Sequence, residues 1–176
     1  MSEKITSGGP LPELDLPLAG GGEVHLGGAK DNRRDGWQMI VVYRGLHCPI
    51  CKKYLGRLQG LLGEFNYNDI QVVTVSGDPA DKAETAKAEW GFDGPVAYGM
   101  SKEQMKAWGL YISDPRSAQE TDRPFPEPAL FVVRPDGNVQ IAEVANAPFV
   151  RPDLDTLLGG LKFIQESGYP VRGTGG

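Results

Sequence analysis

MIVVYRGLHCPICKKYL, residues 39–55, is the stretch of sequence that decides the fold of this chain. It opens with an apolar, largely β-branched run at residues 40–43, which predicts a buried strand. A short loop leads from this strand to Cys48 and Cys51. Pro49 follows Cys48 at the first position of a predicted helix, where the missing N–H of proline costs nothing. The stretch therefore predicts a strand, a loop and a helix that begins with a Cys-x-x-Cys pair.

The composition limits the class of protein. With 176 residues the chain is long enough for one domain, predicted to span residues 1–176 with flexible ends at 1–10 and 172–176. Apolar residues make up 40%, charged residues 23%, and the net charge is −5, as in soluble globular proteins. An acidic chain gives no electrostatic reason to expect nucleic acid or a membrane as partner. The N-terminus lacks the apolar core of a secretory signal, so we expect a cytoplasmic protein.

The rest of the chain predicts strands and helices in alternation. Strands joined through helices favour parallel pairing, and a late hairpin adds antiparallel strands. The predicted fold class is α/β, with a mixed β-sheet flanked by helices and an N-terminal β-hairpin. The predicted elements are a hairpin over 14–26, a strand at 38–43, a helix over 49–65, a strand at 70–75, a helix over 79–90, a short strand at 95–98, a helix at 101–108, an irregular loop over 113–128, a hairpin over 129–144 and a helix over 153–165.

The two cysteines are the only ones in the chain, and their spacing is typical of a catalytic dithiol. Cys48 stands at the N-cap of the predicted helix, where free backbone N–H groups and the helix dipole favour the reactive thiolate. Cys51 lies one turn further into the helix. We therefore predict that Cys48 attacks and that Cys51 resolves the mixed disulfide or sulfenic acid formed at Cys48. Arg44 and His47 precede Cys48 in the same loop and are candidate catalytic residues that lower its pKa.

Two other interpretations of the cysteine pair stay open. One is an inert pair buried in the core. The other is a zinc site shared by two chains, because zinc needs four ligands and His25 and His47 are the only histidines. The redox interpretation is favoured, and it requires neither a metal nor a cofactor.

The Cys-Pro-Ile-Cys motif after a buried strand resembles the thioredoxin superfamily. Over almost its whole length the chain is similar to the AhpC/TSA (alkyl hydroperoxide reductase/thiol-specific antioxidant) branch, including the peroxiredoxin-like redoxins. The hairpin region 11–26, the strand-turn-strand that follows Pro128, and the string YRGxxCPxC at residues 43–51 carry the resemblance. It implies a thioredoxin-like fold, with Pro128 as a cis-proline that faces the dithiol and belongs to the catalytic site.

The chain departs from the pattern of peroxidases in this family at three places. Val41 and Gly45 stand where that pattern has a proline and a threonine or serine. Pro128 occupies the approach to the late strand where the family has an arginine, and Arg44 is the candidate to replace that arginine. The missing hydroxyl at residue 45 makes peroxide chemistry secondary to dithiol chemistry in this prediction.

We therefore expect a thiol-dependent oxidoreductase that cycles a Cys48–Cys51 disulfide, reduces protein disulfides and peroxides, and serves antioxidant defence and cell redox homeostasis. A thiol reductant such as a thioredoxin or glutathione system would recharge it. The alternative is a redox sensor or binding module, in which the disulfide changes the loop 113–128 and a partner surface without turnover. A homodimer is left open, and neither nucleic acid nor a membrane is expected as partner.

Overall fold

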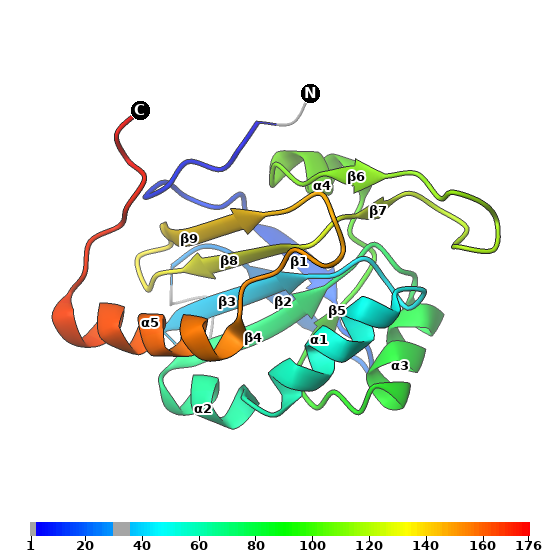
Figure 1. Ribbon diagram of the computed structural model, residues 1–176, viewed down its shortest axis with the longest axis horizontal. Coiled ribbons are helices and arrows are strands. Elements are labelled where there is room, and N and C mark those ends of the chain that lie inside the picture. The colour runs from blue at the N-terminus through cyan, green and yellow to red at the C-terminus, as the bar shows by residue number, and fades with distance from the viewer. Residues whose placement is uncertain (1–2, 30–35) are drawn as a thin grey trace.

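The computed structural model describes residues 3–29 and 36–176, and a five-stranded sheet forms its centre (Figure 1). Residues 1–2 of the N-terminal segment predicted to be flexible lie outside the described residues. The strands are β1 (Leu14–Pro17), β2 (Glu23–Leu26), β3 (Trp37–Val42), β4 (Ile70–Val75), β5 (Val96–Ala97), β6 (Ile112–Ser113), β7 (Phe125–Pro126), β8 (Ala129–Val133) and β9 (Val139–Val144). The helices are α1 (Pro49–Gln59), α2 (Leu62–Tyr67), α3 (Ala80–Glu89), α4 (Lys102–Ala107) and α5 (Leu154–Ser167).

The central sheet is mixed, with the strand order β5-β4-β3-β8-β9. β3 pairs in parallel with β4, and β4 pairs in parallel with β5. β8 is antiparallel to both β3 and β9. The parallel neighbours are joined through helices, whereas a tight turn joins β8 to β9. Together with the antiparallel β1–β2 hairpin, this arrangement confirms the predicted α/β class with a mixed sheet and flanking helices.

Alternate residues of β3 point to opposite faces of the sheet and build two cores. Met39 and Val41 belong to a cluster that includes side chains of α1, α2 and α5. Ile40 and Val42 belong to a second cluster, which includes side chains of the β1–β2 hairpin and of α4. In Figure 1, α1, α2 and α5 lie below the sheet and α4 lies above it. Because both faces of β3 are buried, these four residues are all apolar instead of alternating with polar ones.

The helix predicted over residues 49–65 is in fact two helices. Gly60 caps the end of α1, and α2 begins at Leu62. A glycine inside a helix costs about 1 kcal/mol relative to alanine, so a break at this position is inexpensive. After the break, Leu62 and Phe65 both pack into the core beneath the sheet.

The segment 113–128, predicted to be irregular, is bounded by a short antiparallel pair. Ile112 lies opposite Pro126, and Ser113 lies opposite Phe125. The chain between β6 and β7 forms an arm that extends to the right in Figure 1. This pairing brings the end of the arm back to the start of β8, next to the loop that carries the cysteines.

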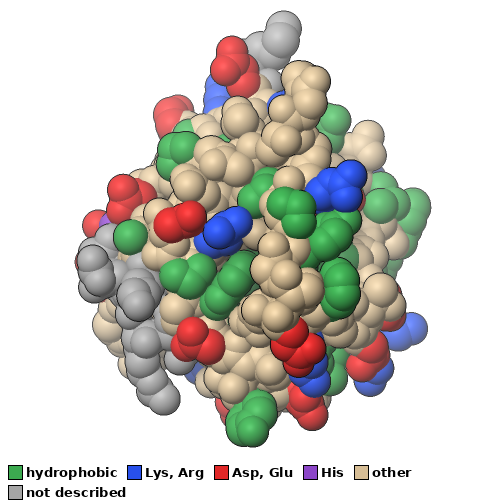
Figure 2. Space-filling model, turned by 90° about the vertical axis from the view of Figure 1, so that its left-hand side faces the viewer, with side chains coloured by type: hydrophobic (Ala, Val, Ile, Leu, Met, Phe, Trp, Pro, Cys, Tyr) green, Lys and Arg blue, Asp and Glu red, His purple; other side chains and the backbone are tan. Residues whose placement is uncertain are grey.

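The face shown in Figure 2 is mixed in character. Acidic, basic and hydrophobic side chains are interspersed over it, and no large area carries one sign of charge. Within residues 3–29 and 36–176, no helix is both long and apolar enough to cross a membrane.

Packing of α1 under the sheet can be tested at Leu58, whose side chain is 0% exposed. We expect Leu58→Ala to lower the free energy of unfolding by about 2–5 kcal/mol, because it removes buried methyl groups and leaves a cavity. Urea denaturation followed by circular dichroism measures this change. The control is Tyr67→Ala, which changes a side chain that is 89% exposed and should alter stability by no more than about 0.5 kcal/mol. Equal losses in the two variants would contradict this account of the core.

Candidate active site

Cys48 lies at the junction of β3 and α1. It is the N-cap of α1, and its backbone is extended (φ −104°, ψ 107°), as is usual for that position. Its sulfur accepts a hydrogen bond from the backbone N–H of Cys51 at 3.3 Å. The thiol of Cys48 therefore satisfies a free N–H group of the first helical turn, as a serine or aspartate oxygen does in other helices.

The surroundings of Cys48 favour its thiolate. The Nη1 atom of Arg44 lies 3.8 Å from the Cys48 sulfur. The pKa of Cys48 is lowered to about 5, first by the hydrogen bond from the Cys51 side chain, then by the Cys51 backbone N–H and by Arg44, while burial opposes the shift. Cys48 is therefore ionised at neutral pH although its side chain is only 1% exposed.

Cys51 has the opposite character. Its side chain is fully buried, and its sulfur accepts hydrogen bonds from the backbone N–H of Arg44 at 3.4 Å and from Nη2 of Arg151 at 2.9 Å. Burial raises the pKa of the Cys51 thiol far above its usual value, and the neighbouring Cys48 raises it further, whereas Arg151 lowers it. One sulfur is thus a thiolate while the other stays a thiol, which is the inequality that an attacking and a resolving cysteine need.

Arg151 was missed by the sequence prediction. It lies in the segment between β9 and α5, one hundred residues after the cysteine that it contacts. Its Nε–H donates to the carbonyl of Pro148 at 2.6 Å, and its guanidinium lies 5.1 Å from the ring centre of Tyr54. No spacing or motif in the chain signals this contact, because it depends on how the last loop folds back over α1.

Arg44 is held on its other side by a buried carboxylate that the sequence prediction also missed. Its Nε lies 3.0 Å from Oε1 of Glu127, as an ion pair without the alignment of a hydrogen bond. Glu127 is 3% exposed and accepts a hydrogen bond from the hydroxyl of Ser113 at 2.7 Å. The guanidinium also lies over the ring of Phe125, at 4.7 Å from its centre. Arg44 therefore links the thiolate of Cys48 to both strands at the base of the arm.

His47 is placed against an aromatic ring. Its imidazole packs edge-on to Phe125 with ring centres 4.6 Å apart, and neither ring nitrogen has a hydrogen-bond partner among the described residues. Burial lowers the pKa of His47, and the positive charge of Arg44 lowers it further. An imidazole that is neutral at pH 7 adds no positive charge beside Cys48. Its catalytic role stays a prediction.

The prediction that Pro128 is a cis-proline is wrong, because no cis peptide bond occurs in the described residues. The backbone N–H of Glu127 donates to the carbonyl of Tyr111 at 2.8 Å, and the carbonyl of Pro128 accepts from the N–H of Ala145 at 2.9 Å. These bonds hold the chain extended as it enters β8, and the trans form of an X–Pro bond is lower in energy by about 0.5–1 kcal/mol. Pro128 borders a small hollow together with Arg151.

The two departures Val41 and Gly45 have structural reasons. Val41 pairs with β4 on one side and β8 on the other, where a proline would remove a hydrogen bond of the sheet. Gly45 has φ +143°, and a Cβ atom there would lie 2.8 Å from Oδ1 of Asp78. The other oxygen of this buried carboxylate accepts a hydrogen bond from the N–H of Leu46 at 2.8 Å. Asp78 thus occupies the space that the Cβ atom of a threonine at residue 45 would need.

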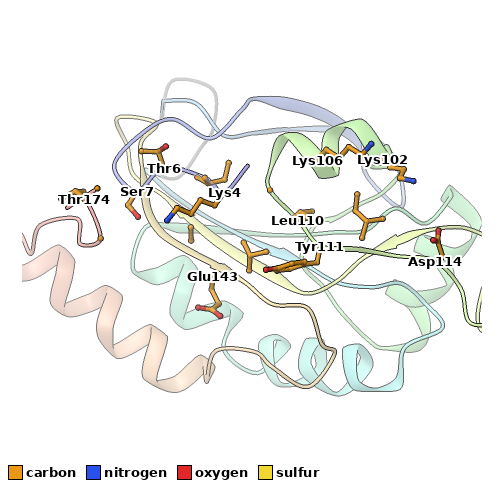
Figure 3. Close-up of a pocket in the computed structure, with 17 residues that line it drawn as sticks. Lys4, Thr6, Ser7, Lys102, Lys106, Leu110, Tyr111, Asp114, Glu143 and Thr174 are labelled. Carbon is orange, nitrogen blue, oxygen red and sulfur yellow. The ribbon is translucent and has the colours of Figure 1, made fainter. Parts of the chain in front are cut away.

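A cavity of about 960 Å³ lies elsewhere on the molecule (Figure 3). It is bordered by the N-terminal segment, α4, the chain around Tyr111 and strand β9. Figure 3 shows Lys102 and Lys106 on one side of it and Glu143 on the other. Neither cysteine borders this cavity, so the dithiol chemistry does not take place in it. In the described part of the chain, no cluster of three or more histidine, cysteine, aspartate or glutamate side chains could hold a metal ion.

Comparison with known sequences finds a family model and related proteins. Residues 7–142 match the model of the AhpC/TSA family. A Mycobacterium tuberculosis protein with the name "Putative peroxiredoxin" is 27% identical over 143 residues, which cover 80% of this chain and 85% of that protein.

Comparison with solved structures shows the fold. A cysteine-to-serine mutant of peroxiredoxin 6 from Arenicola marina has a TM-score of 0.75 at 19% identity, covering 93% of this chain and 75% of that one. A peroxiredoxin-like protein from Aquifex aeolicus has a TM-score of 0.75 at 18% identity, covering 92% of this chain and 89% of that one. These likenesses confirm the predicted thioredoxin-like fold.

The close approach of Asp78 to Gly45 can be tested with alanine. We expect Gly45→Ala to lower the free energy of unfolding by more than about 1 kcal/mol, because alanine is strained at φ +143° and collides with the carboxylate. Thermal and urea unfolding measure the loss. The matched control is Gly56→Ala in the middle of α1, where a Cβ atom would meet nothing within 4 Å. Alanine there should raise stability by about 0.4–1 kcal/mol. A Gly45→Ala variant as stable as the unaltered protein would refute the steric argument.

Proposed function

Because the chain belongs to the AhpC/TSA family of thiol-dependent peroxidases and oxidoreductases, we propose that it reduces small hydroperoxides through a redox centre formed by Cys48 and Cys51. The observation that carries this proposal is the Cys48 sulfur at the N-terminus of α1, with the Cys51 N–H at 3.3 Å and Arg44 Nη1 at 3.8 Å. These donors stabilise a nucleophilic thiolate.

The first step of the proposed reaction is attack of the Cys48 thiolate on the peroxide O–O bond. The distal oxygen is transferred to sulfur, Cys48 becomes a sulfenic acid, and the leaving oxygen takes a proton and departs as an alcohol or water. In this step Arg44 donates to the oxygens as their charge develops, and the 3.8 Å approach of its Nη1 atom to the Cys48 sulfur supports this role. Glu127 keeps that guanidinium in position through the 3.0 Å ion pair.

Burial of Cys48 supports a small substrate. The residue is 1% exposed, so a peroxide has far easier access to the sulfur than a disulfide carried by a protein. The residue Gly45 supplies no side-chain hydroxyl, which leaves Arg44 and backbone N–H groups as the donors to the substrate. Cys51 then attacks Cys48 to form the disulfide, and a cellular thiol reductant of the thioredoxin or glutathione type restores both thiols.

A redox sensor is the second candidate function, and the contacts of Arg44 favour it. Oxidation removes the negative charge of Cys48, so Arg44 is left with Glu127 as its anionic partner. Glu127 is also bonded to Ser113 at the base of the arm between β6 and β7. The charge of the dithiol is in this way coupled to the arm, whose surface a partner protein would read.

Substrate preference separates these functions. We expect hydrogen peroxide and a small organic hydroperoxide to oxidise the reduced protein faster than a protein disulfide does, and Cys48→Ser to abolish the reaction. Stopped-flow kinetics with a thioredoxin-coupled assay measure both. Cys51→Ser should instead accumulate a sulfenic acid that a dimedone reagent traps. Faster oxidation by the protein disulfide would favour disulfide exchange, and oxidation without turnover would favour the sensor.

The pH dependence of Cys48 reactivity follows from its lowered pKa. The thiolate should persist as the pH falls from alkaline values and disappear only as the pH passes through about 5. Alkylation by iodoacetamide, mapped to Cys48 by mass spectrometry, should therefore be half-maximal near that pH. We expect Arg44→Met to move the midpoint upward by about 1 unit, because a neighbouring positive charge is lost.

The control for this shift is Arg116→Met, which removes the same charge from a side chain that is 85% exposed. Its midpoint should stay where it is in the unaltered protein. If the midpoint of the Arg44→Met variant equals that of the unaltered protein, Arg44 does not stabilise the thiolate.

A further inference from the structure

Cys51 has its own arginine, separate from the one that serves Cys48. Nη2 of Arg151 lies 2.9 Å from the Cys51 sulfur. The side chain of Arg44 is directed instead at Cys48 and Glu127, and it offers Cys51 only its backbone N–H. Each sulfur is thus contacted by a different guanidinium group, one from the loop between β3 and α1 and the other from the loop between β9 and α5.

The guanidinium of Arg151 is held in place before any reaction occurs. Its Nε–H donates to the Pro148 carbonyl at 2.6 Å within its own loop. Its planar group lies over the ring of Tyr54, at 5.1 Å from the ring centre. The hydroxyl of Tyr54 in turn donates to the carbonyl of Pro152 at 2.7 Å, which ties the loop to α1. The position of Arg151 is therefore set by α1, the same helix that carries Cys51.

We propose that Arg151 is a second catalytic arginine, which makes Cys51 the nucleophile of the resolving step. This proposal rests on the proposed redox centre and adds to it the residue that controls its second half. The contact supplies a positive charge and an N–H donor to a sulfur that is 0% exposed and has no solvent to stabilise its anion.

The order of the two steps follows from the charges around the sulfurs. While Cys48 is a thiolate, a second anion at Cys51 would be repelled, so Cys51 keeps its proton. Oxidation of Cys48 by a hydroperoxide or by a disulfide removes that negative charge. The groups that then face the Cys51 sulfur are the Arg44 N–H and the Arg151 guanidinium, both of which stabilise an anion. Arg151 therefore acts after the first step and not during it.

The resolving step differs between a sulfenic acid and a mixed disulfide at Cys48 only in its leaving group. Cys51 loses a proton, its sulfur attacks the Cys48 sulfur, and the S–S bond forms. From a sulfenic acid, the S–O bond breaks and the leaving hydroxide takes up the proton as water. From a mixed disulfide, the bond to the outer sulfur breaks and the reagent leaves as a thiolate, with the proton released to solvent.

A small aromatic disulfide tests this proposal without peroxide. With 2,2′-dithiodipyridine, attack by Cys48 releases one chromophoric thione, and attack by Cys51 on the resulting mixed disulfide releases the second. Because the chain has only these two cysteines, the two releases report the two steps separately. We expect the rate of the first release in Arg151→Met to stay within about twofold of that in the unaltered protein at pH 7. The rate of the second release should fall about tenfold.

The pH profile of the second release distinguishes catalysis from a structural role. A tenfold loss of thiolate corresponds to an upward shift of about 1 pH unit in the profile. Besides Cys48, the titratable side chains of Tyr43 and Tyr54 lie around Cys51 and Arg151. Both tyrosines have their pKa raised by burial and stay neutral over the range of the assay. Arg151→Lys keeps the charge but not the planar donor pair and should give an intermediate rate.

The matched control is Arg57→Met, which removes the same charge from the surface of α1, where the side chain is 63% exposed. Both releases should stay unchanged in it. Arg151 is not catalytic if the second release is unaltered in Arg151→Met, or if both releases fall in the same proportion. Should Arg151→Met fail to fold by circular dichroism, an unaltered second release in folded Arg151→Lys would overturn the proposal. Failure of hydroperoxides to oxidise Cys48 would refute the proposed peroxidase function alone.

Discussion

The hydrogen bond from the Cys51 N–H to the Cys48 sulfur, 3.3 Å long, exists because α1 begins at Pro49. That starting point is set in turn by β3, which lies between two cores and leaves only a short loop before the helix. Backbone donors at a helix start are fixed in direction and cost nothing to arrange when the reaction begins. A shift of the helix start by one residue would remove the sulfur from them. The chemistry of the site therefore depends on the packing of the sheet.

Around that hydrogen bond, charge is divided between two arginines. Arg44 comes from the loop before the helix and is braced by the buried carboxylate of Glu127. Arg151 comes from the loop before the last helix and is braced by a tyrosine of α1. A guanidinium that is partly withdrawn from water is favourable only when its partners are charged or well hydrogen-bonded. The two arginines are thus held in position by different partners, independently of each other. Each lies within hydrogen-bond reach of a different sulfur.

The departures from the peroxidase pattern illustrate how packing decides which residues are compatible with the site. Gly45 is needed because the Asp78 carboxylate stands where a side chain would begin, and because the backbone there has φ +143°. The Asp78 side chain is itself buried, which raises its pKa, and the N–H of Leu46 compensates part of that cost. The loop before Cys48 is thus built around an internal carboxylate. Around the Cys48 sulfur the site therefore presents a backbone donor and an arginine in place of a hydroxyl.

The sequence by itself determined the order of strands and helices, the mixed sheet and the position of both cysteines at a helix start. It also indicated Arg44 as a candidate catalytic residue. All of these follow from local periodicity and from neighbours along the chain. Only the tertiary structure decided what lies around the sulfurs. Arg151, 103 residues after Cys48, donates to the Cys51 sulfur, and Glu127, 79 residues after Cys48, pairs with the arginine that faces the Cys48 sulfur. The bond before Pro128 is trans and not cis as predicted. Contacts of this kind depend on how loops fold over the sheet, and no pattern within one segment encodes them.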